Sequence, residues 1–135
     1  MTESDVVVAC DKIARDLGWD VESYSDTRKV RTHPGLPDRR YVQRSRGHRV
    51  WVELKGTSGP TVREQCKLTR QQHRWLLAEL AAGGLATCID HPDQLRRLLS
   101  LLSRDAGRGE AMRLCGEWLA LQASKGYRGE AKGAA

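Results

Sequence analysis

Residues 35–55 read GLPDRRYVQRSRGHRVWVELK, and this stretch predicts a β-hairpin that carries a group of charged residues. The glycine and proline at its beginning are typical of a turn. In the strand expected over residues 49–55, Glu53 and Lys55 lie on the same face, because side chains two residues apart point the same way. Asp38 follows the turn directly, at the start of the neighbouring strand. We therefore expect two carboxylates and one ammonium group to converge on a small site.

This combination of groups suits phosphate chemistry. The carboxylates of Asp38 and Glu53 are hard oxygen ligands of the kind that Mg²⁺ prefers. Lys55 beside such an ion can orient a water molecule for attack on a phosphodiester. Two non-catalytic interpretations remain open. Asp38 can be an ordinary turn residue after proline, and Glu53 and Lys55 can belong to a solvated strand face.

Size and composition indicate one compact basic domain. The chain has 135 residues, enough for a hydrophobic core. Its 23 Lys and Arg against 17 Asp and Glu give a net charge of +6, which favours polyanionic partners and nucleic acid first. We expect a cytoplasmic protein with reduced thiols and no membrane contact. The reasons are the absence of a signal-peptide pattern, of a long apolar stretch and of closely spaced pairs among Cys10, Cys66, Cys88 and Cys115.

Hydrophobic periodicity predicts an α/β fold with the order α-β-β-β-α-β-α and an extra C-terminal helix. Within the hairpin, the face opposite Glu53 is apolar and is expected to enter the core. Thr2 with Asp5 and Thr69 with Gln72 have the spacing of capping boxes at two helix starts. The predicted helices cover residues 2–17, 69–82, 92–102 and 110–123, and the predicted strands cover 19–24, 40–43, 49–55 and 85–89.

Three motifs together resemble the VRR-NUC branch of the PD-(D/E)XK nucleases. They are the Gly-x-Pro-Asp turn, the Val-Glu-Leu-Lys strand and the Thr-x-x-Gln-x-x-Trp helix that begins at Thr69. Members of that branch are often phage-encoded and resemble Holliday-junction resolvases. The resemblance implies a restriction-endonuclease-like core in residues 1–103, with a mixed sheet of about four strands flanked by helices. Residues 104–124 then form a C-terminal helical extension, and we expect residues 125–135 to be a disordered tail.

The resemblance also implies roles for individual residues. Asp38 matches the first metal-binding acid of the family and Glu53 matches the second. Lys55 matches the catalytic lysine, and Gln72 matches a glutamine of the following helix that lies near the active site. The implied cofactor is Mg²⁺, for which Mn²⁺ can substitute. Gln72 is explained equally well as a capping residue.

Two further metal ligands follow from the same resemblance. Glu3 lies in the first helix, where family members carry an additional acidic residue, and the backbone carbonyl of Leu54 is the other expected ligand. Glu3 has an alternative explanation, because an acidic residue at a helix N-terminus interacts favourably with the helix dipole.

Five basic residues are candidates for binding DNA. Arg39 and Arg40 stand where the family usually continues with aliphatic residues, and an inward arginine is costly unless it is paired. We expect one of them to contact DNA phosphate. A basic loop that contains Arg28, Lys29 and Arg31 is the other candidate surface.

The expected function is that of a metal-dependent DNA endonuclease, selective for branched DNA such as junctions or flaps, in replication, repair or recombination. The alternative is a catalytically inactive DNA-binding or DNA-packaging accessory protein that keeps the nuclease fold. Junction resolution needs two active sites, hence a homodimer. An apolar stripe on residues 110–123 is a candidate dimer interface, unless it packs on its own domain.

Overall fold

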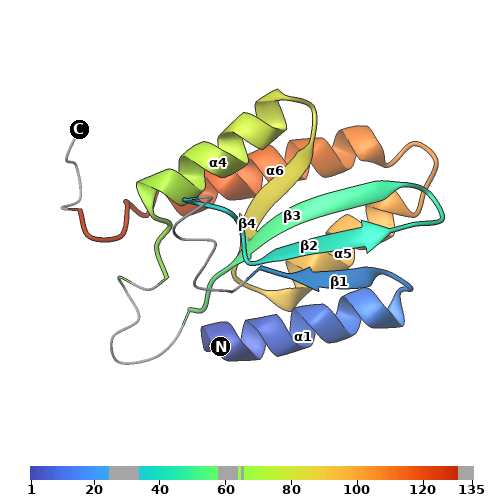
Figure 1. Cartoon of the computed structure of the whole chain (residues 1–135), viewed down its shortest axis with the longest axis horizontal. Coiled ribbons are helices and arrows are strands. Elements are labelled where there is room, and N and C mark those ends of the chain that lie inside the picture. The colour runs from blue at the N-terminus through green and yellow to red at the C-terminus, as the bar shows by residue number, and fades with distance from the viewer. Residues whose placement is uncertain (25–33, 58–63, 65, 131–135) are drawn as a thin grey trace.

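The computed structural model describes residues 1–24, 34–57, 64 and 66–130. The candidate DNA-binding residues Arg28, Lys29 and Arg31 lie outside these ranges. Figure 1 shows a sheet flanked by helices. Its elements in chain order are α1 (Glu3–Asp16), β1 (Asp20–Ser23), β2 (Arg39–Gln43), β3 (His48–Leu54), α4 (Arg70–Ala81), β4 (Leu85–Ile89), α5 (Pro92–Leu102) and α6 (Arg108–Ala123).

The four strands form one mixed sheet in the order β1-β2-β3-β4. Neighbouring strands are antiparallel from β1 to β3, and β3 and β4 are parallel. A parallel pair needs a crossover connection, and α4 lies in that connection. The predicted α/β fold, its mixed sheet and the order of its elements are therefore confirmed.

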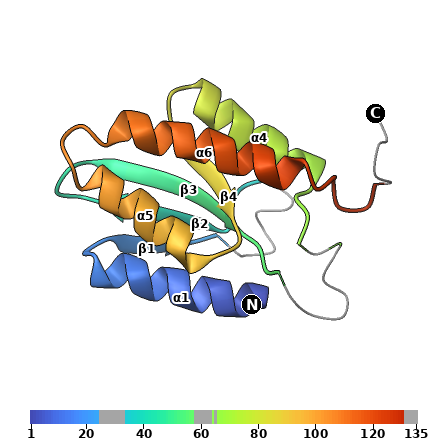
Figure 2. The same ribbon diagram turned by 180° about the vertical axis from the view of Figure 1, so that it is seen from behind.

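The two faces of β3 differ as the alternation predicts. Val50, Val52 and Leu54 are completely buried in the larger hydrophobic cluster, together with side chains of α1 and α5. Trp51 faces the other way and packs edge-on against Trp75 of α4, with 5.0 Å between ring centroids. In Figure 2, which shows the molecule from behind, α6 lies between α5 and α4, and it contacts both helices.

Capping boxes hold the first turns of α1 and α4. The Thr2 and Thr69 hydroxyls accept hydrogen bonds from the backbone N–H groups of Asp5 and Gln72, whose side chains accept from the backbone of the two threonines. Both predicted caps are confirmed. Among the described residues, no helix combines the length and apolar character needed to cross a bilayer.

The last helix is part of the core and not an appended element. It begins at Arg108, lies along β4 and contacts both α4 and α5. Its side chains Ala111 and Cys115 belong to the same cluster as β3, and Leu119 belongs to a second cluster with α4. Most of the apolar stripe therefore packs on its own domain, which removes the argument for a dimer interface there. The homodimer itself stays a prediction.

The segment after α6 is not the disordered tail that we expected, at least over residues 125–130. The backbone N–H of Arg128 donates to the carbonyl of Leu68 at 2.8 Å, and the Glu130 carboxylate pairs with Arg70 at 2.9 Å. We expected disorder because the sequence has few apolar residues here. Backbone and charged groups, not apolar side chains, attach this segment to the rest of the domain. Residues 131–135 lie outside the described ranges.

The turn before Asp38 rests on the first turn of α4. Gly35 has φ +87°, and a Cβ atom there would lie 2.4 Å from the carbonyl oxygen of Gln71. Only glycine combines this backbone conformation with so close an approach. Gly18, after α1, has a similar φ of +84°, but a Cβ atom there would meet no other atom within 4 Å.

The two glycines make a matched pair for a stability experiment. Gly18→Ala should lower the free energy of unfolding by about 1 kcal/mol through the left-handed backbone alone. Gly35→Ala should lower it by about 3 kcal/mol, because the clash with α4 adds to the backbone cost. Urea titrations followed by circular dichroism measure both values. Equal losses for the two variants would show that the turn does not press on α4.

Candidate active site

Strand pairing brings Asp38 beside Glu53. Arg39, the first residue of β2, pairs with Val52 of the antiparallel strand β3. Asp38, just before Arg39, therefore lies opposite Glu53, just after Val52. The backbone N–H of Asp38 donates to Oε1 of Glu53 at 3.2 Å. The predicted meeting of the two acidic residues is therefore confirmed by geometry.

Lys55 completes a buried group of opposite charges. Its Nζ lies 3.4 Å from Oε2 of Glu53, and both side chains are only 3% exposed. The backbone N–H of Lys55 donates to the carbonyl of Ile89, which continues the pairing with β4 and keeps Lys55 on the same face as Glu53. Charges removed from water in this way are costly unless they have partners, so a solvated strand face is excluded.

Burial and the Glu53 charge together raise the pKa of the neighbouring Cys88 thiol well above its ordinary value. Cys88 lies opposite Glu53 on β4. It therefore stays neutral at physiological pH and adds no negative charge to the site.

Gln72 caps α4 and also contacts Glu53. Its Oε1 accepts from the backbone N–H of Thr69 at 2.9 Å, as a capping residue. Its Nε2 donates to Oε2 of Glu53 at 3.3 Å. One amide thus caps α4 and fixes the orientation of the Glu53 carboxylate.

The N-terminus of α1 brings a third carboxylate to this place. Carboxylate oxygens of Glu3, Asp38 and Glu53 all lie within 4.8 Å of one another. The approach depends on Gly56, where a Cβ atom would lie 2.5 Å from the backbone nitrogen of Glu3. The backbone N–H of Thr57 also donates to the carbonyl of Met1 at 2.8 Å. The segment after β3 therefore holds the beginning of α1 against the end of the sheet.

The three carboxylates form a donor set that fits a hard divalent cation. Mg²⁺ takes oxygen ligands and is commonly held by a few carboxylates, with water and substrate phosphate completing its coordination. Three acids so close together repel one another, and a divalent cation relieves that repulsion. The position of the Leu54 carbonyl relative to these oxygens stays a prediction.

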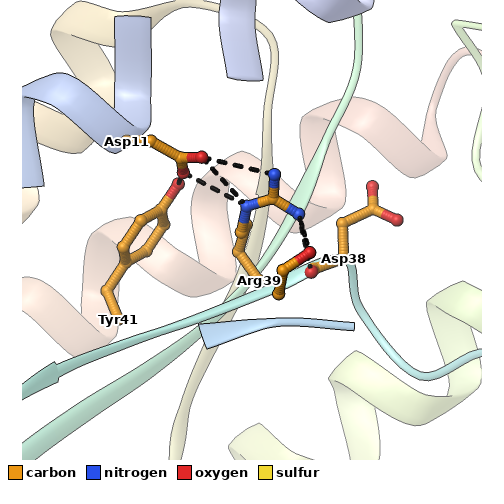
Figure 3. Close-up of polar contacts among 5 residues, drawn as sticks. Asp11, Asp38, Arg39 and Tyr41 are labelled. Carbon is orange, nitrogen blue, oxygen red and sulfur yellow. Dashed lines mark hydrogen bonds and ion pairs between the residues drawn. The ribbon is translucent and has the colours of Figure 1, made fainter. Parts of the chain in front are cut away.

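Arg39 is buried beside the site and is not available to DNA. As Figure 3 shows, its guanidinium lies between Asp11 of α1 and the backbone of Asp38. Its Nε is 3.2 Å from Oδ1 of Asp11, and its Nη1 donates to the Ser23 hydroxyl and the Asp38 carbonyl at 2.8 and 3.2 Å. The Tyr41 hydroxyl donates to the same Asp11 oxygen at 2.9 Å. The expectation that Arg39 binds DNA phosphate is corrected: it joins α1 to the start of β2.

Arg40 points to the opposite face of the sheet and is partly exposed. It forms an ion pair with Glu22 and lies over the Trp51 ring, with its Cζ 5.2 Å from the centroid. This hydrogen bond from Arg40 lowers the pKa of the Glu22 carboxyl. A DNA contact by Arg40 would have to compete with Glu22, and it stays a prediction.

Sequence reasoning missed two residues that position the site. Asp11 had a usable signal: it lies in α1 next to the buried residues Cys10 and Ala14, and an inward arginine on β2 demands an acidic partner. Gly56 offered only a glycine after a strand, which is common in loops. Its close approach to α1 depends on how two distant segments meet, and no local pattern contains that information.

Comparison with known proteins found no match for this chain among protein-family models, curated proteins or solved structures. The functional assignment therefore depends on the site itself.

The Asp11–Arg39 pair predicts a large stability effect at one position of α1. Asp11→Asn should lower the free energy of unfolding by about 3 kcal/mol, because it breaks the ion pair between Asp11 and the buried Arg39. Tyr41→Phe should cost about 1 kcal/mol, since it removes one hydrogen bond and keeps the ion pair. Asp16→Asn is the matched control on the same helix, because its pair with Lys12 is exposed, and should change stability by less than about 0.5 kcal/mol. Urea unfolding that gives equal losses for Asp11→Asn and Asp16→Asn would contradict the buried pair.

Proposed function

We propose that this protein is a metal-dependent endonuclease that hydrolyses phosphodiester bonds in DNA. The observation that carries the proposal is the buried Lys55 ammonium group, 3.4 Å from a carboxylate oxygen of Glu53, which itself belongs to the cluster of three acids. A structural ion pair would need one carboxylate for one lysine. Here three carboxylates lie within 4.8 Å of one another, and such a set of oxygen donors suits a divalent cation.

Asp38 and Glu53 would hold the metal, and Glu3 would add a third oxygen ligand. A bound Mg²⁺ supplies positive charge next to the scissile phosphate and lowers the pKa of water. The hydrogen bonds from Gln72 and from the Asp38 backbone limit the rotation of the Glu53 carboxylate. Such preorganisation is required if the ligands are to hold one geometry during the reaction.

Lys55 would act on the reacting groups directly. Its ammonium group has three donors, and only one is needed for Glu53. The others can orient a water molecule toward the phosphorus atom and donate to a phosphate oxygen as negative charge develops there. The low exposure of Lys55 strengthens these electrostatic interactions.

DNA as the substrate is supported by the net charge of +6 and by the resemblance of the turn, strand and helix motifs to VRR-NUC nucleases. The same resemblance supports branched DNA, a homodimer and a role in replication, repair or recombination, and it supports Mn²⁺ as a substitute cation. These finer assignments are part of the proposal.

Three substitutions test the proposed site. Asp38→Asn, Glu53→Gln and Lys55→Met should each reduce Mg²⁺-dependent DNA cleavage by at least about a hundredfold, and a chelator should abolish it. The carboxylate variants should also weaken Mg²⁺ binding in calorimetry, whereas Lys55→Met should retain it. Asp93→Asn and Lys12→Met, which change exposed residues of the same types, are matched controls and should cleave normally.

A panel of junction, flap, nicked, single-stranded and duplex DNA identifies the substrate in the same experiment. Normal cleavage by a folded Glu53→Gln protein would overturn the site assignment. DNA binding without cleavage of any member, with either Mg²⁺ or Mn²⁺, would favour the accessory DNA-binding protein instead.

A further inference from the structure

The segment after α6 crosses the beginning of α4. Besides the bond from Arg128 to Leu68, the backbone N–H of Gly129 donates to Oε2 of Glu64 at 2.8 Å. Figures 1 and 2 show this segment and the N-terminal ends of α1 and α4 at the same end of the molecule. The candidate active site lies at that end, because it contains Glu3 of α1 and Gln72 of α4.

The contacts of this segment orient Arg70. The guanidinium of Arg70 lies over the Tyr127 ring, with its Cζ 4.4 Å from the centroid. The Tyr127 hydroxyl is itself 2.6 Å from Nδ1 of His73, one turn further along α4. A stacked guanidinium loses less freedom when it binds an anion, so Arg70 is prepared for such a ligand.

The carboxylate of Glu130 already binds Arg70. Nη2 of Arg70 lies 2.9 Å from Oε1 of Glu130, and Nε lies 3.2 Å from Oε2. This two-point arrangement is the one by which arginine also binds phosphate. Hydrogen bonds from Arg70 lower the pKa of Glu130. Arg74 follows Arg70 by four residues on α4, so the two arginines lie on the same face of the helix.

Positive charge exceeds negative charge on this surface. Lys67 pairs with Glu64 and Arg70 pairs with Glu130, whereas Arg74 and Arg128 form no ion pair with any residue that the structure describes. A surface with this excess attracts a polyanion.

We propose that Arg70, Arg74 and Arg128 bind the phosphate backbone of nucleic acid, and that Glu130 competes with phosphate for Arg70. The proposal extends the proposed endonuclease by naming the surface that holds its substrate, and it replaces Arg39 as the expected contact. Arg70 and Glu130 are each about one-third exposed, at 35% and 33%. An ion pair so open to water contributes little to stability, so a phosphate group can displace Glu130 without disturbing the fold.

Binding to a fluorescently labelled duplex, measured by anisotropy in the presence of a chelator over a range of salt concentrations, tests this surface. The double variant Arg70→Gln/Arg74→Gln should weaken binding about tenfold at ~0.1 M salt and reduce the slope of log affinity against log salt by about 2, because two phosphate contacts are lost. Glu130→Gln should tighten binding about two- to fivefold, since the competing carboxylate is neutralised. The double variant Arg96→Gln/Arg97→Gln on the exposed side of α5 carries the same charge change and should bind much more tightly than Arg70→Gln/Arg74→Gln.

Each outcome decides the question. Equal affinities for the two arginine double variants, or weaker binding by Glu130→Gln, would overturn the surface. Because a chelator prevents metal-dependent cleavage, this result is separate from the nuclease assay. A protein that cleaves DNA but whose Arg70→Gln/Arg74→Gln variant binds like Arg96→Gln/Arg97→Gln contradicts only the surface. If the protein binds DNA through this surface but cleaves no DNA, only the proposed endonuclease activity is contradicted.

Discussion

Glu53 and Lys55 carry opposite charges and are both buried. Their contact constrains the segments that pack around them. The alternation of β3 forces both side chains to one face once Leu54 enters the core. Each then needs polar partners, because a buried charge without them is strongly destabilising. Glu53 receives hydrogen bonds from the Asp38 backbone and from Gln72. The hairpin turn and the start of α4 are therefore tied to the same carboxylate.

A second buried ion pair acts on the other side of this site. Arg39 links Asp11, in the middle of α1, to the backbone of Asp38. Since α1 also supplies Glu3, this ion pair links the helix that carries Glu3 to the segment that carries Asp38. The contacts that hold α1 on the sheet also bring the three carboxylates within 4.8 Å of one another. A divalent cation between these carboxylates would relieve the repulsion.

The sequence predicted the parts of this arrangement that depend on local patterns. Strand alternation placed Glu53 with Lys55, and capping-box spacing located the starts of α1 and α4. Contacts between distant segments were less accessible. Arg39 looked like a DNA contact because its partner, Asp11, is 28 residues away. The segment after α6 looked disordered because polar groups, not an apolar face, attach it to α4. Glu3 was implied by the resemblance, but its approach to Glu53 depends on Gly56, whose role no local pattern reveals.

We propose that Glu3, Asp38 and Glu53 bind a divalent cation beside Lys55. The most direct measurement is a crystal structure of the protein soaked in Mn²⁺, with anomalous scattering recorded to locate the ion. We expect an anomalous peak about 2.0–2.6 Å from oxygens of the three carboxylates, the range for hard divalent cations. Ordered carboxylates without a peak between them, in crystals where Mn²⁺ binds elsewhere, would show that this cluster is not a metal site.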